Sequence, residues 1–214
     1  MVNSMEVIEI IRRICGRLEK EKDYLTRLDQ PIGDSDHGIN MARGFQAVEK
    51  KLADLSEADI GEILKTTGMV LVSTVGGASG PLYGSAFLKA GMALAGKREM
   101  DLEDFLTCLG ASVEAVKQRG KATAGEATML DAMIPALQAM REKTDEGQPA
   151  AEVLSCGVRA SWEGVEHTKG LVATKGRASY VGERGLGHED PGAASFSVML
   201  ETIAESLAGA ERSL

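Results

Sequence analysis

The sequence predicts an all-α fold, a bundle or closed barrel of eight antiparallel amphipathic helices. Aromatic residues make up only 4% of the 214 residues, and Ala, Leu, Met, Glu and Lys, which favour helices, dominate. Apolar residues recur every three or four positions in one segment after another, which is the period of one helix face. Because most connections between these segments are short, neighbouring helices are expected to be antiparallel. We therefore expect a single domain over residues 1–214.

Four apolar stripes predict the helices of the N-terminal half. The second helix begins at Gly38, and the third follows the turn-like segment LSEAD. Pro81 is well placed as the first residue of the fourth helix, which runs toward Gly96. The stripes are, helix by helix, Ile11, Ile14, Cys15 and Leu18; Met41, Phe45, Val48 and Leu52; Ile60, Ile63, Leu64 and Leu71; and Phe87 and Leu88.

Four more stripes predict the helices of the C-terminal half. Asp101 can cap the fifth helix and Gly120 can end it. Pro135 lacks the N–H that the helical hydrogen-bond ladder needs, so it is expected to kink the sixth. The stripes are Leu102, Phe105, Leu106, Leu109, Val113 and Val116; Met129, Met133, Ile134 and Leu137; Leu154, Val158, Trp162 and Val165; and Phe196, Leu200, Ile203 and Leu207.

The composition excludes several classes of protein. Lys and Arg total 24 against 32 for Asp and Glu, a formal net charge of -8, which argues against a nucleic-acid partner. Nowhere do about 18 apolar residues follow one another, and the N-terminus lacks the order of a signal peptide, so we expect a cytoplasmic protein with no membrane partner. Cys15, Cys108 and Cys156 show no metal-binding spacing and are expected to be buried, reduced thiols.

The segment LDQPIGDSDHGIN concentrates three acids, Asp29, Asp34 and Asp36, before the second helix. Either these carboxylates diverge into solvent as an ordinary turn, or they gather around a hard cation such as Mg²⁺. An EF-hand is excluded, because the twelfth position is Phe45 counted from Asp34 and Asn40 counted from Asp29, where a Glu is required. Two Mg²⁺ ions would outweigh the three carboxylates and leave the site receptive to a polyphosphate.

A glycine-rich stretch, VGGASGPLYGSAF, precedes the fourth helix. Backbone N–H groups at Gly76, Gly77 and Gly80, with the Ser79 hydroxyl, can cradle a phosphate at a helix start. The stretch is not a Walker A loop, because no Gly-Lys followed by Ser or Thr occurs in the chain. Close packing of small residues between helices is the alternative.

The segment KGRASYVGERGLGHEDPG, before the last helix, has five glycines from Gly176 to Gly192 and no sustained periodicity. Such a loop is either a mobile cover over a ligand or a surface excursion. Arg177 and Arg184 are candidates for the cation that neutralises a phosphate. His37, beside an acid, is either a phosphate donor or a hydrogen-bonded surface group.

The chain resembles the DhaL family, the nucleotide-binding subunits of phosphoenolpyruvate-dependent dihydroxyacetone kinases, and the equivalent domain of ATP-dependent dihydroxyacetone kinases. The resemblance lies in LTRLDQPIGDSDHGINMARGF, GGASGPLYGSAF, GEATMLDAMIPAL and KGRASYVGERGLGHEDPGAAS, which follow in order over most of the chain. It implies a barrel of eight up-and-down helices that binds ADP or ATP at one end. It also implies that Asp29, Asp34 and Asp36 hold two Mg²⁺ ions.

The resemblance further implies which residues contact the nucleotide. Those expected at the phosphates, at the adenine and ribose, and in the covering loop are His37, Gly38, Ile39, Asn40, Ala78 and Ser79; Gly120 and Met129; and Arg177, Asp190, Pro191 and Gly192. From the residues alone, Met129 is either a side chain that packs against a flat base or ordinary core. One departure is Ser35, which replaces the middle glycine of the family's GDGDHG. If that position needs a positive φ, the serine is strained by about 1 kcal/mol or more.

The implied function is phosphoryl transfer with the nucleotide as a bound coenzyme. A phosphohistidine partner would phosphorylate ADP, and the ATP would phosphorylate dihydroxyacetone held on another subunit, since this chain offers no good substrate-binding base. A free-standing subunit is expected from a chain of this length, and a homodimer is a possible state. The alternatives are a subunit that exchanges ATP and acts on another ketose or polyol, a nucleotide-sensing regulatory module, and a purely structural helical protein.

Overall fold

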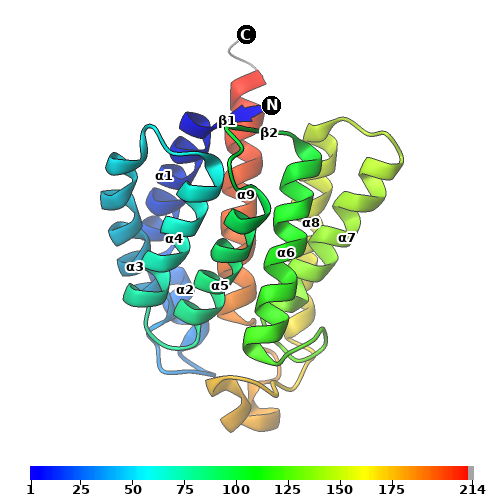
Figure 1. Cartoon of the computed structure of the whole chain (residues 1–214). Helices are drawn as coiled ribbons and strands as arrows, with labels where there is room; N and C mark the ends of the chain where they lie inside the picture. The colour runs from blue at the N-terminus through cyan, green and yellow to red at the C-terminus, as the bar shows by residue number, and fades with distance from the viewer. Residues whose placement is uncertain (212–214) are drawn as a thin grey trace.

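The computed structural model describes residues 1–211 and is almost entirely helical (Figure 1). This confirms the predicted fold class. Within this range the α-helices are α1 (Ser4–Lys20), α2 (Lys22–Asp29), α3 (His37–Leu52), α4 (Ile60–Thr74), α5 (Ser79–Ala93), α6 (Leu102–Gly120), α7 (Leu130–Asp145), α8 (Ala150–Thr168) and α9 (Pro191–Glu211). Short 3-10 helices are η1 (Ala53–Leu55), η2 (Arg177–Tyr180) and η3 (Gly182–Gly185).

Eight of these helices form a closed ring. In chain order α1 packs against α3, α3 against α4, and each later helix against the next as far as α9, which packs against α1. The eight predicted stripes fall on these eight helices, and most of their residues are buried. The connections α2–α3, α4–α5 and α6–α7 and the segment before α9 all lie at one end of the ring, the lower end in Figure 1.

Three local features differ from the sequence-based expectation. The short helix α2 follows α1 after Glu21 and packs against α3 and α9, with Leu25 fully buried. Strands β1 (Val2–Asn3) and β2 (Glu99–Met100) form a small antiparallel pair. Pro81 is the third residue of α5 and not the first, which a helix tolerates because the first N–H groups have no intrahelical partner.

The ends of α6 agree with the residues that the sequence predicts for them. Asp101 caps α6 by accepting a hydrogen bond from the Asp104 N–H at 2.9 Å. α6 ends at Gly120, although the left-handed residue is the next one, Lys121, with φ of 48°. α7 continues through Pro135.

Glycines allow α4 and α5 to pack with their backbones in close approach. A Cβ at Gly68 would lie 2.7 Å from the Gly84 carbonyl oxygen, and one at Gly61 would lie 2.7 Å from the Gly91 oxygen. Any larger side chain at these positions would separate the two helices. The α4–α5 hairpin therefore holds the glycine-rich turn at its tip in a fixed place.

The three cysteines agree with the expectation of buried thiols. Cys15, Cys108 and Cys156 are buried and unpaired, and burial raises the pKa of Cys15 and of Cys108 to about 12. Among residues 1–211, none of the helices has the length and apolar character needed to cross a bilayer.

Candidate functional site

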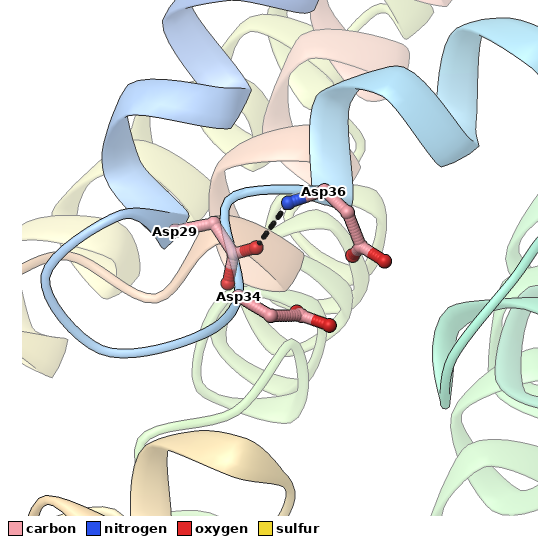
Figure 2. A group of neighbouring side chains, drawn as sticks. All are labelled: Asp29, Asp34 and Asp36. Carbon is pink, nitrogen blue, oxygen red and sulfur yellow. Dashed lines mark hydrogen bonds between the residues drawn. The ribbon is translucent and has the colours of Figure 1, made fainter.

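Three aspartates meet in the loop between α2 and α3 (Figure 2). Asp29 ends α2, and its Oδ2 accepts hydrogen bonds from the backbone N–H groups of Asp36 at 2.9 Å and His37 at 3.2 Å. These bonds fold the loop back onto the end of α2. One carboxylate oxygen from each of Asp29, Asp34 and Asp36 then lies within 4.8 Å of the other two. The acids gather at one point instead of diverging into solvent.

A glycine and a strained serine shape this loop. A Cβ at Gly33 would lie 1.9 Å from Asp29 Oδ1, so the chain passes too close to the carboxylate for any other residue. Ser35 has φ of 61°, which confirms that this position needs the left-handed conformation. The conformation costs a serine about 1 kcal/mol or more relative to glycine. The loop therefore stores a small strain at the point where the acids converge.

The electrostatics of Asp34 reflect its crowded surroundings. Partial burial raises the pKa of Asp34, and the charges of Asp36 and Asp29 raise it further. Arg177 opposes this shift, because its Nη2 lies 2.8 Å from Asp34 Oδ2. The guanidinium of Arg177 therefore neutralises part of the negative charge of the three carboxylates.

The donor set fits a hard divalent cation. It consists only of carboxylate oxygens, which Mg²⁺ and Ca²⁺ prefer, and it has no sulfur or imidazole ligand. Among residues 1–211, this is the only group of three His, Cys, Asp or Glu residues close enough to share an ion. Within the part of the chain that the structure describes, the acidic loop is therefore the place where the side chains suit a cation.

A pocket of about 520 Å³ opens beside the acids, within the usual range for small-molecule sites. Its wall is built from the ends of several helices and from the segment before α9. It is lined by Asp29, Asp34, Asp36, His37, Asn40, Ala78, Ser79, Gly120, Met129, Arg177, Asp190, Pro191 and Gly192, among others. Thirteen of the fifteen residues expected at the site therefore come together here.

The other two expected residues lie outside this lining. Gly38 faces α2, because a Cβ there would lie 2.0 Å from the Lys22 carbonyl oxygen. Ile39 is half exposed in the first turn of α3. Arg184 also lies outside the pocket lining.

The sequence left two interpretations of the glycine-rich turn open, a phosphate cradle and close packing of small residues. In the structure its glycines divide between the pocket wall and helix packing. Gly77 has φ of 65°, and a Cβ at Gly76 would lie 2.9 Å from Asn40 Oδ1, so both glycines shape the pocket wall. A Cβ at Gly80 would lie 2.3 Å from the Val75 carbonyl oxygen, so this glycine serves close packing. α5 begins at Ser79 beside the pocket, where its free N–H groups favour an anion.

A buried polar network connects three segments of the pocket. His37 Nδ1 lies 3.1 Å from Ser79 Oγ, and its Nε2 lies 3.0 Å from Ser195 Oγ. Ser195 Oγ lies 2.7 Å from the Tyr83 hydroxyl, which donates to the Gly192 carbonyl at 3.1 Å. Burial lowers the pKa of His37 to about 4, so the ring is neutral at neutral pH. His37 is a buried pocket residue, not a surface group.

Tyr83 and Ser195 lie within the segments that carry the family resemblance, but the sequence analysis gave neither of them a role. Ser195 lies 158 residues after His37 and 112 residues after Tyr83, although all three meet in the network. The one available hint in the sequence was a serine within the mostly apolar segment AASFS, and the structure shows that it is buried. Arg119 also lines the pocket without a sequence motif to mark it, and Lys175, the first residue of the glycine-rich segment, lines it as well.

The glycine-rich segment before α9 covers the pocket and contains the 3-10 helices η2 and η3. Its first part is tied to the loop before α7: Thr174 Oγ1 donates to Glu126 Oε1 at 2.6 Å, and Lys175 Nζ lies 3.4 Å from the same oxygen. Arg177 then reaches Asp34. At the other end of the segment, burial raises the pKa of Asp190 to about 7. These contacts favour a cover over a ligand more than a surface excursion.

The ring and the pocket define a class of protein: a closed helical barrel with three clustered carboxylates and the start of a helix in one cavity at its end. The family model of the DAK2 domain matches residues 31–205, and the chain belongs to the DAK2-domain family.

Related proteins support the same assignment. The chain is 41% identical over 191 residues to "PEP-dependent dihydroxyacetone kinase, ADP-binding subunit DhaL" of Escherichia coli, covering 89% of this chain and 91% of that protein. It is 44% identical over 200 residues to the corresponding kinase 2 subunit of Listeria innocua, covering 92% of each. The native dihydroxyacetone kinase of C. freundii matches with a TM-score of 0.74 and 25% identity, over 96% of this chain and 35% of that one. The resemblance to the DhaL family is confirmed.

Proposed function

We propose that this protein is the ADP-binding subunit of a phosphoenolpyruvate-dependent dihydroxyacetone kinase. The observation that carries the proposal is the convergence of Asp29, Asp34 and Asp36 in a pocket of about 520 Å³, in a chain that aligns almost end to end with ADP-binding subunits. The pocket offers carboxylates for a cation and helix starts for a diphosphate. The protein is thus a phosphotransferase subunit.

Asp29, Asp34 and Asp36 would hold Mg²⁺. When bound, the metal supplies positive charge that neutralises the phosphate oxygens during transfer. We expect two ions, because their four positive charges offset three carboxylates and still attract a polyphosphate. Arg177, which pairs with Asp34 in this structure, is then free to contact a phosphate.

The remaining lining residues divide into a phosphate side and a nucleoside side. Ser79, Asn40 and the start of α5 offer donors next to the acids and are proposed as phosphate contacts. Gly120 and Met129 line the same pocket and are proposed as base and ribose contacts. The neutral ring of His37 holds the Ser79 hydroxyl in place from behind.

The chain supplies positioning and charge neutralisation, which are the main needs of phosphoryl transfer. Dihydroxyacetone is proposed to bind on a partner subunit, in keeping with the subunit names of the relatives. A phosphohistidine protein as the donor to ADP, a cytoplasmic location and a homodimer also belong to this proposal. Incubation with the dihydroxyacetone-binding subunit and either ATP or a phosphohistidine donor identifies the donor in one assay.

The Asp34→Ala variant tests the site. We expect it to abolish phosphoryl transfer and Mg-ADP binding measured by calorimetry. Asp54→Ala is a matched control, because Asp54 is 69% exposed on η1 and pairs only with Lys51 at 3.5 Å. Retained transfer in the Asp34 variant would refute the kinase role. Loss of partner binding with retained transfer would favour a regulatory module.

The retention of nucleotide distinguishes a coenzyme from an exchangeable substrate. We expect ADP to remain with the purified protein through gel filtration. Free exchange would favour a subunit that uses ATP from solution, acting on dihydroxyacetone or on another ketose or polyol.

A further inference from the structure

An arginine outside the pocket is bonded to a polar residue in its wall. Arg43 lies one turn after Asn40 on α3, and its Nη2 donates a hydrogen bond to Asn40 Oδ1 at 2.7 Å. Its Nε donates to the backbone carbonyl of Thr74, the last residue of α4, at 3.2 Å. The guanidinium therefore ties Asn40 to the end of α4, just before the glycine-rich turn.

This contact fixes which end of the Asn40 amide faces the ligand. A guanidinium carries donors and no acceptor, so the amide atom that it contacts is the carbonyl oxygen. The amide nitrogen, with its two donors, is left for the pocket that Asn40 lines. Within residues 1–211, no group accepts a hydrogen bond from Asn40 Nδ2.

The glycine-rich turn restricts the amide from another side. Asn40 is only 6% exposed, and a Cβ at Gly76 would lie 2.9 Å from its Oδ1 and 3.1 Å from its Nδ2. The amide therefore packs against backbone and has little room for another side-chain rotamer. A flip of its plane, which exchanges oxygen and nitrogen in nearly the same space, remains possible unless Arg43 prevents it.

We propose that Arg43 is a positioning residue that holds the Asn40 amide with its N–H donors toward the phosphates of the nucleotide. Arg43 is exposed and is not among the residues that line the pocket. Without it, the amide can flip and turn its carbonyl oxygen toward an anion, which removes a donor and adds repulsion. The proposal deepens the proposed function and rests on it, because it assumes that the pocket takes a diphosphate.

A double-mutant cycle on Mg-ADP affinity, measured by calorimetry, tests whether Arg43 acts through Asn40. Arg43→Met should weaken binding about tenfold, the scale of one hydrogen bond to a charged group. Asn40→Ala should weaken it by a similar or larger factor. Added to Asn40→Ala, the Arg43→Met change should alter affinity by less than about twofold.

Two further variants control for charge and for folding. Arg13→Met removes another exposed arginine, with only a long contact of 3.7 Å to Glu9, and should leave affinity unchanged. Circular dichroism checks that each variant folds. If Arg43→Met does not fold, Arg43→Lys is used, because one ammonium cannot reproduce the fork that spans both carbonyls. Its loss of affinity should likewise disappear in the Asn40→Ala background.

Each outcome separates the two proposals. An equal loss in both backgrounds would show that Arg43 acts through its own charge, and no loss at all would show that it has no role; either result overturns this inference and leaves the proposed function intact. The affinities are measured on protein from which bound nucleotide has been removed, and a wild-type protein in this state that does not bind Mg-ADP refutes both proposals.

Discussion

Replacing Gly38 with alanine should force apart the two helices that carry the acidic loop. Gly38 is the second residue of α3, and a Cβ there would lie 2.0 Å from the Lys22 carbonyl oxygen and 2.6 Å from Thr26 Oγ1. The Lys22 oxygen already accepts a hydrogen bond from the Thr26 hydroxyl at 2.8 Å within α2, so it cannot move alone. Because Cβ atoms essentially never approach closer than 3.0 Å, α2 and α3 must separate by about 1 Å.

The expected loss of stability is about 3 kcal/mol, the upper end for overpacking, because the obstacle is backbone and not a flexible side chain. Gly16 provides the matched comparison. It is also a helical glycine, on α1, but no atom lies within 4 Å of the position that a Cβ would take there. Gly16→Ala should therefore stabilise the protein by about 0.5–1 kcal/mol, the ordinary gain in a helix.

Urea unfolding followed by far-ultraviolet circular dichroism measures both variants. Mg-ADP affinity should fall with Gly38→Ala as well, because separating α2 from α3 lengthens the 2.9 Å bond from the Asp36 N–H to Asp29. The affinity of Gly16→Ala should be unchanged. A Gly38→Ala protein as stable as Gly16→Ala would refute the close approach of the two helices.

Three shorter predictions follow from the site. Ser35→Gly should raise the free energy of unfolding by about 1 kcal/mol by relieving the left-handed serine, whereas Ser35→Ala should not; equal urea midpoints for the two would contradict this. Burial raises the pKa of Asp190 from 3.8 to about 7, so the stability that its protonated form contributes is lost as the pH rises across this window. Asp190→Asn should thus gain stability relative to the wild type between about pH 4 and about pH 7, and a constant difference would count against the shift. Ser195→Ala should lower the free energy of unfolding by about 1–3 kcal/mol, because it leaves His37 Nε2 and the Tyr83 hydroxyl without their shared partner. A thermal melt that matches the wild type would show that the network does not stabilise the protein.

The sequence predicted the helices well because a stripe of apolar residues is a local property. The segment from Asp101 to Gly120 carries its cap, its period and its end within one stretch, and α6 begins at Leu102 and ends at Gly120. α2 was missed because its eight residues hold one fully buried apolar side chain, Leu25, which makes no stripe. Two-residue strands such as β1 leave no periodic signal at all.

The acidic loop could be recognised from the sequence because its chemistry is carried by residue types in one short segment. Three carboxylates within eight positions, counted from Asp29 to Asp36, predict either repulsion or a cation wherever the loop lies. The positive φ of Ser35 could also be predicted, since it follows from the family's glycine at the same position.

The sequence by itself determined the all-α class, the acidic loop and the glycine-rich turn, because each depends on neighbours along the chain. Only the tertiary structure decided which distant residues complete the site. Arg43 reaches Thr74, Ser195 reaches His37, and Arg177 reaches Asp34 across 31 or more residues of chain. The packing of α3 against α4 and the closure of the helix ring bring these partners together, and no local pattern along the chain records such contacts.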